Sequence, residues 1–182
     1  VTHRFLDFAG FDAEISRMFA TLHPAVVHFP IALLLLGSVC ALLYLYGLRR
    51  AELLVLTWAP LFLGWLATGA AILTGLLAQS GLPPDPPYRD VLNQHIGSGM
   101  ALTVLYAVLL YRAYLQRARA SSSKAGKNAA RNAKHAPGSP ELLDDPRARL
   151  WVTLLLAAGM LLVIASGWNG GQLVYEWGVN VR

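Results

Sequence analysis

The sequence has little cysteine and little charge, and both shortages exclude whole classes of protein. Cys40 is the one cysteine among 182 residues, so there is no disulfide framework, no CxxCH site for covalent haem and no thiolate cage for a metal. Charged residues make up 14% and hydrophobic residues 55% of the chain, a balance that does not fit an ordinary soluble domain. Any bound metal must therefore be held mainly by histidine.

Catalytic motifs are also missing. The chain shows no nucleophile next to a base, no phosphate-binding loop and no pair of carboxylates along one helix. Asp85, Asp90 and Glu176 are too scattered for acid–base chemistry. No basic region leads directly into an apolar core and a cleavage site, so we expect no removable signal peptide. These gaps indicate an electron-transfer or accessory subunit rather than a stand-alone enzyme.

Long uncharged runs are what the sequence does contain. A hydrocarbon core of about 30 Å needs roughly 20 apolar residues in a helix, and no residue from Pro24 to Tyr46 is charged. Three further runs have a similar character. The sequence therefore predicts an all-α polytopic membrane protein, a four-helix transmembrane bundle of residues 23–182 embedded in the lipid bilayer. The predicted spans are residues 24–46, 53–78, 91–111 and 150–168.

The segments outside these runs have three different characters. Residues 1–22 carry apolar side chains at steps of three and four, which predicts an amphipathic helix on the membrane surface or against another subunit. Residues 115–148 are rich in Ala, Ser, Lys and Asn, which predicts a disordered linker. Asn169-Gly170-Gly171 is expected to stop the last helix, leaving residues 169–182 as a tail.

The basic residues predict the orientation. Arg49 and Arg50, with nine Lys or Arg between Arg112 and Arg149, make eleven of the fifteen basic residues in the chain. By the positive-inside rule these two loops lie in the cytoplasm and both termini lie outside, in a bacterial cytoplasmic (inner) membrane. The net charge of +5 is thus a topology signal, and it gives no reason to expect nucleic acid as a partner.

Two histidines open the first and third predicted spans. His28 and His95 both lie near the outer face, and intramembrane histidines usually face a bundle interior. We expect them to be axial ligands of one b-type haem, with Gly99 opening space one turn from His95. His23 lies about 140° from His28 around an ideal helix, so it is the alternative ligand from the first helix.

A small-residue stripe on the second span, Gly64, Thr68, Ala71 and Gly75, is expected to allow close approach of another helix or a flat ligand. In the tail, Tyr175 and Glu176 lie on the side of the histidines. Glu176 is expected to orient a ligating histidine by accepting its ring N–H.

Two other interpretations remain open at this point. A copper or zinc ion could be bound by His23, His28, His95 and Glu176, if all four converge. A protein without a cofactor could instead brace a larger membrane complex through its small-residue stripe and surface helix.

Two pieces of sequence, LHPAVVHFPIALLLL in the first span and GGQLVYEWGVNV after the last, resemble the DUF2231 family of bacterial predicted membrane proteins. The resemblance implies a four-span domain, sometimes joined to Rieske-type iron–sulfur or cytochrome c modules, and hence a redox role. This chain has neither module, so a quinol, a periplasmic cytochrome c or a Rieske-type protein is expected as a separate partner. Some relatives resemble the chain at His23 but not at His28, which leaves the ligand from the first helix open.

Overall fold

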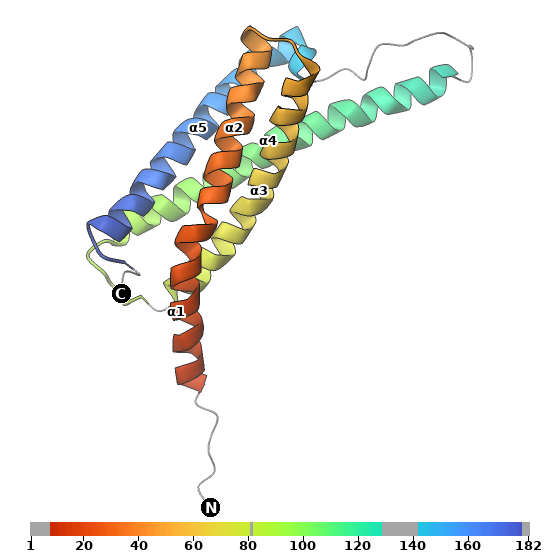
Figure 1. Ribbon diagram of the computed structural model, residues 1–182. Coiled ribbons are helices and arrows are strands. Elements are labelled where there is room, and N and C mark those ends of the chain that lie inside the picture. Colours follow the sequence, from red (N-terminus) through yellow and green to blue (C-terminus); the bar gives the residue numbers. More distant parts are fainter. Residues whose placement is uncertain (1–7, 81, 129–141, 180–182) are drawn as a thin grey trace, which may run out of the picture.

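The computed structural model describes residues 8–80, 82–128 and 142–179 and, of residues 8–13, 15–17 and 120–128, the backbone alone. This part of the chain is helical and contains no strand, which confirms the predicted all-α class (Figure 1). Its elements in order are α1 (Phe8–Val26), α2 (His28–Tyr46), α3 (Ala51–Gln79), α4 (Arg89–Asn128), the short 3-10 helix η1 (Leu142–Asp144) and α5 (Pro146–Tyr175).

Four stretches of these helices are long and apolar enough to cross a membrane. They are Met18–Tyr46, Ala51–Gln79, Arg89–Arg119 and Pro146–Tyr175. Each predicted span lies within one of them. Large apolar side chains cover their outer faces, for example Val55 (67% exposed), Leu73 (63%) and Leu161 (67%). A surface of this kind is matched to lipid rather than to water.

The first span is longer than expected at its N-terminal end. The expected start at Pro24 is wrong, because α1 runs through Pro24 and only Val27 separates α1 from α2. The backbone bonds continue across this joint, from Val27 N–H to the His23 carbonyl (3.1 Å) and from Ile31 N–H to the Val27 carbonyl (3.3 Å). Pro24 and Pro30 donate no such bonds, so the helix is kinked here but not ended.

α1 also packs against α3 (Figure 1). From Met18 onward α1 therefore belongs to the bundle and is not a separate helix on the membrane surface, as residues 1–22 were expected to be. Residues 1–7 of that predicted helix lie outside the described residues.

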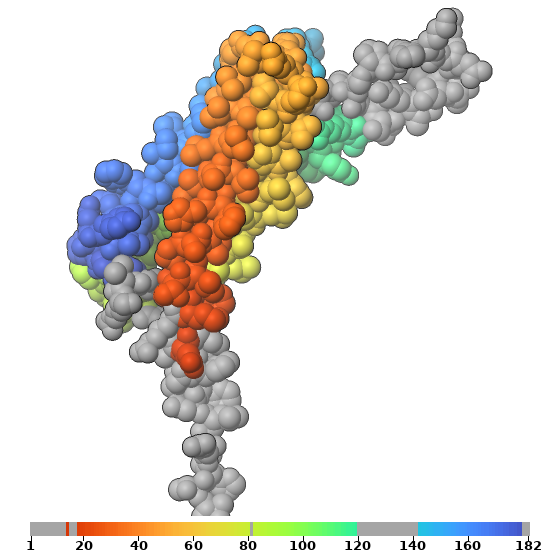
Figure 2. Space-filling model, in the orientation of Figure 1, coloured from red at the N-terminus to blue at the C-terminus, as the bar shows by residue number. Residues whose placement is uncertain are grey.

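The bundle consists of two helix pairs. α2 packs most extensively on α3, and α4 on α5; α2 and α3 lie side by side along the face seen in Figure 2. A Cβ added to Gly64 would lie 2.9 Å from the Leu34 side chain, so the small-residue stripe of α3 does allow α2 to approach closely. The pairs are joined in the core, where the hydroxyls of Ser38 on α2 and Tyr106 on α4 lie 2.8 Å apart, both fully buried.

The expected disordered linker of residues 115–148 differs most from the structure. α4 continues to Asn128 and extends away from the other helices (Figure 1). Leu142 and Leu143 of η1 are buried in the core, and Asp145 caps α5 by accepting a hydrogen bond from Arg147 N–H (2.9 Å). Ala, Arg, Lys and Gln favour helix, and the pair of leucines buries apolar surface, which accounts for the order at the two ends of this range. Residues 129–141 lie outside the described residues.

The last helix is also longer than expected. α5 passes through Asn169-Gly170-Gly171 and ends at Tyr175. The chain then turns back, with Trp177 N–H bonded to the Gln172 carbonyl (3.2 Å) and Val179 N–H to the Leu173 carbonyl (2.8 Å). Gly178 has φ of +63°, a conformation that suits glycine at the end of a helix.

Candidate functional site

His23 on α1 and His95 on α4 meet near the end of the bundle where α5 finishes. Their ring centroids are 6.1 Å apart and their planes are nearly perpendicular, at 85°. Both residues are partly buried. The contact joins the two helix pairs, since α1 packs on α3 and α4 packs on α5. Two intramembrane histidines facing one another form the candidate site.

The His23 ring is fixed by α3. Its Nδ1 lies 3.1 Å from Thr74 Oγ1, and that oxygen lies 3.0 Å from the carbonyls of both Ala70 and Ala71. The one hydroxyl proton of Thr74 is directed to these carbonyls, so Thr74 Oγ1 accepts the bond from His23 Nδ1–H. This assignment follows from the hydrogen-bond network. It leaves the lone pair of the neutral ring on His23 Nε2.

The His95 ring is fixed by α5 in an equivalent way. Its Nδ1 lies 2.9 Å from the carbonyl oxygen of Ser166, with the Ser166 hydroxyl farther away at 3.5 Å. A carbonyl oxygen can only accept, so Nδ1 carries the proton. His95 Nε2 then has the lone pair as well. Both rings thus have the tautomer that leaves Nε2 able to bind a metal or accept a proton.

A glycine lies against each ring on the same helix that holds its Nδ1. A Cβ added to Gly75, beside Thr74, would lie 3.0 Å from His23 Cε1, and one added to Gly170, a turn after Ser166, would lie 3.1 Å from His95 Cε1. Such contacts are tighter than ordinary carbon–carbon contacts of about 3.5–4.0 Å. The glycines therefore let the rings approach the backbones of α3 and α5.

Other glycines at this end of the bundle border open space. A Cβ added to Gly97 or Gly99 on α4, or to Gly167 or Gly171 on α5, would meet nothing within 4 Å. Gly99 lies one turn after His95 on α4, and an added Cβ there would meet no other atom within 4 Å.

His28 does not join the site. It is exposed, and its Nδ1 bonds to the carbonyl oxygen of Pro24, one turn earlier on its own chain. The structure therefore brings His23, and not His28, to His95. The reason is the phase of the helix, because two residues five positions apart cannot both face the bundle interior.

The expected role of the tail is not seen either. Tyr175 is 89% exposed, and the Glu176 carboxylate lies 3.4 Å from Gln172 Nε2 on the same helix end. Thr74 and the Ser166 carbonyl hold the histidine Nδ1 atoms instead. Neither of these two hydrogen-bond acceptors was identified from the sequence. Thr74 gave only a weak signal, as the residue directly before Gly75 of the small-residue stripe. The Ser166 carbonyl gave no signal, because every residue has a backbone carbonyl.

A metal site built from three or four side chains finds no support in the described residues. Among them, no group of three His, Cys, Asp or Glu lies close enough together to bind an ion. The four ligands considered for copper or zinc thus reduce to two, His23 and His95.

The sequence was compared with models of known protein families, and one family matches. The model of DUF2231, described as a predicted membrane protein, matches residues 20–182. The match includes both histidines of the candidate site and all four spans except the first two residues of Met18–Tyr46. Comparison with curated proteins and with solved structures finds no match.

Proposed function

The chain belongs to the DUF2231 family of predicted membrane proteins, and on that premise we propose that it is a haem-binding electron-transfer subunit in which His23 and His95 are the axial ligands of one b-type haem. The observation that carries the proposal is that the Nδ1 atom of each ring lies within hydrogen-bond distance of an oxygen on a neighbouring helix. Each Nδ1–H is donated to an oxygen of a neighbouring helix, at 3.1 Å for His23 and 2.9 Å for His95. Outer partners of this kind are typical of ligating histidines, because they orient the ring and increase its basicity.

The separation of the rings supports the same proposal. Two imidazoles would hold one ion only if a nitrogen of each ring came within about 2 Å of it, so the two ring centres would have to lie close together. The centroids of His23 and His95 are 6.1 Å apart. The nearly perpendicular ring planes are compatible with ligation from two separate helix pairs.

The small ligand set favours haem over a bare ion. A structural zinc site takes four protein ligands and a catalytic one takes three, whereas haem needs from the protein only its axial ligands. The two histidines match that need. A Cβ added to Gly97, Gly99 or Gly171 would meet nothing within 4 Å, so no packed neighbour would have to move for a flat ligand to approach the backbone at these positions.

The position of the histidines in the bundle supports a proposal for the partners. A haem bound there supplies one-electron transfer. The basic loops predict that the histidine end faces away from the cytoplasm, so we infer a quinol in the bilayer, or a cytochrome c or Rieske-type protein outside, as the redox partner. The apolar faces of the four spans also allow assembly into a larger membrane complex.

The test is an absorption spectrum of the purified full-length chain, expressed with haem available. We expect a Soret band that shifts on reduction. His23→Ala and His95→Ala should each lose most of the bound haem, while His28→Ala, a matched control on the same kinked span, should retain it.

Two outcomes would overturn the proposal. Loss of the band in His28→Ala with retention in His23→Ala would contradict the ligand pair. A folded wild-type chain with neither haem nor metal would leave the bracing role in a larger complex as the better explanation.

A further inference from the structure

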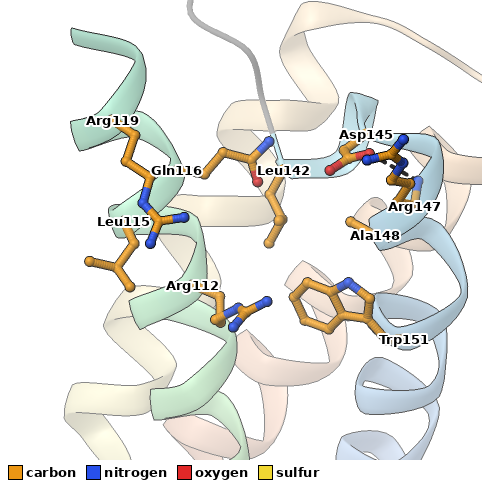
Figure 3. Close-up of a pocket in the computed structure, with 9 residues that line it drawn as sticks. All are labelled: Arg112, Leu115, Gln116, Arg119, Leu142, Asp145, Arg147, Ala148 and Trp151. Atoms are coloured by element: carbon orange, nitrogen blue, oxygen red, sulfur yellow. Dashed lines mark hydrogen bonds between the residues drawn. The ribbon is translucent and has the colours of Figure 1, made fainter. Parts of the chain in front are cut away.

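The opposite end of the bundle contains a basic hollow between α4 and α5. Its volume is about 410 Å³, within the range of small-ligand pockets, roughly 300–1,000 Å³. Three guanidinium groups line it, from Arg112 and Arg119 on α4 and Arg147 at the start of α5 (Figure 3). One carboxylate, Asp145, lines it as well, so the formal charge of the lining is +2. The hollow therefore favours an anion.

The three arginines are available to such an anion. In the part of the chain that the structure describes, the ion pairs are Arg49 with Asp144 and Arg89 with Asp85, and none involves Arg112, Arg119 or Arg147. Asp145 is already engaged, since its Oδ1 accepts the capping bond from the backbone of Arg147. In Figure 3 the Arg119 side chain runs back along α4 in the direction of Arg112. The positive charges of these two arginines therefore lie on the same side of the hollow.

The walls of the hollow are apolar as well as basic. Leu115, Leu142 and Trp151 line it, and the Arg112 guanidinium lies 5.4 Å from the centre of the Trp151 ring. Stacking on an aromatic face leaves the N–H groups at the edge of the guanidinium free to donate to a phosphate. A free phosphate ion has no apolar surface to bury against such walls. The glycerol and upper acyl groups of a lipid do have such surface, so the walls favour a lipid.

Pairs of arginine and aromatic side chains near the hollow indicate that it lies at the level of lipid headgroups. Arg117 lies 5.2 Å from the centre of the Trp58 ring and Arg149 lies 4.2 Å from that of Tyr46. Aromatic rings with arginines beside them mark the boundary between the hydrocarbon core and water. Basic pockets between transmembrane helices at this level suit phospholipid headgroups.

We propose that this hollow, between Arg112 and Arg119 of α4 and Arg147 of α5, binds the phosphodiester headgroup of an anionic phospholipid. The shared chemistry is a phosphate oxygen accepting from guanidinium N–H groups. The bound lipid would hold α4 to α5 where α4 leaves the bundle. This site lies at the far end from the histidine pair and does not depend on the haem proposal.

The test measures binding of a short-chain phosphatidylglycerol to the purified full-length chain in neutral detergent, by native mass spectrometry. Phosphatidylcholine of the same chain length, which has no net charge, should bind at least tenfold more weakly. Each guanidinium removed should lower affinity about fivefold, so Arg112→Gln with Arg147→Gln should lower it roughly 25-fold.

The matched control is Arg49→Gln with Arg50→Gln, which removes the same charge at the same end of the bundle but outside the hollow. It should change affinity by less than threefold. An equal loss in the control, or equal binding of the two lipids by the wild type, would overturn the proposal. If the double variant does not fold, Arg119→Gln alone must lower affinity about fivefold, and an unchanged affinity there would also overturn it.

Inorganic phosphate distinguishes the two sources of the anion. We expect it to displace phosphatidylglycerol only at more than a hundredfold excess. Displacement at equal concentration would mean that the hollow is a site for a soluble anion, and the lipid assignment would be wrong.

Discussion

Gly159 on α5 is the position where a single added methyl group should be most damaging. A Cβ there would lie 2.6 Å from Tyr106 Oη, 2.7 Å from Cζ and 2.9 Å from Cε2. Ordinary contacts between heavy atoms are about 3.5–4.0 Å, so the overlap approaches an ångström. The ring cannot move away easily, because Tyr106 is fully buried and bonded to Ser38 Oγ at 2.8 Å.

The size of the effect follows from three contributions. Overpacking a buried site costs about 1–3 kcal/mol, and a displaced ring would leave a buried hydroxyl unpaired at about 1–3 kcal/mol. Against this, alanine is favoured over glycine in a helix by about 1 kcal/mol. Together these contributions amount to about 1–5 kcal/mol, and we expect Gly159→Ala to lower the free energy of unfolding by about 3 kcal/mol.

The assay is equilibrium unfolding of the purified chain in mixed micelles with increasing denaturing detergent. Gly167→Ala is the matched control on the same helix, because a Cβ there meets nothing within 4 Å. The control should be neutral or gain up to about 1 kcal/mol. Equal stability of the two variants would refute the packing described for Tyr106.

Four further variants test single contacts. Tyr106→Phe should lower the free energy of unfolding by about 1–2 kcal/mol, because it leaves the Ser38 hydroxyl unpaired. In the double variant with Ser38→Ala the two losses should not add. Additive losses in the same assay would contradict the hydrogen bond between Ser38 and Tyr106. Thr74→Val should weaken haem binding about 10–100-fold in competition with apomyoglobin by removing the acceptor for His23. Ser166→Ala should change haem binding little, because the acceptor for His95 is the backbone carbonyl; an equal effect of these two variants would contradict the assigned bonds. Asp145→Ala should lower thermal stability by about 1 kcal/mol through loss of the α5 cap, and an unchanged melting temperature would argue against that cap.

The architecture was predictable because it depends on long uncharged runs. A run such as Pro24 to Tyr46 leaves few alternatives to a spanning helix, and all four predicted spans lie inside helices of the structure. The boundaries were less predictable. Proline at position 24 was expected to begin a helix, but packing of α1 on α3 holds the helix together through it.

The sequence alone could not decide whether His23 or His28 faces His95. Their separation around an ideal helix correctly implied that only one of them faces the bundle interior. Which one does so depends on Thr74 and Gly75, which come from another helix about fifty positions away and receive His23. A single sequence contains no measure of that contact, and the deeper position of His28 in the apolar run favoured the other choice.

Our proposal that His23 and His95 together hold one haem iron is best tested by low-temperature electron paramagnetic resonance of the oxidised protein. Two imidazole ligands predict a low-spin ferric signal in the wild type and in His28→Ala, and a high-spin signal in any haem retained by His23→Ala or His95→Ala. A high-spin wild type, or a low-spin signal that disappears in His28→Ala but persists in His23→Ala, would contradict the account.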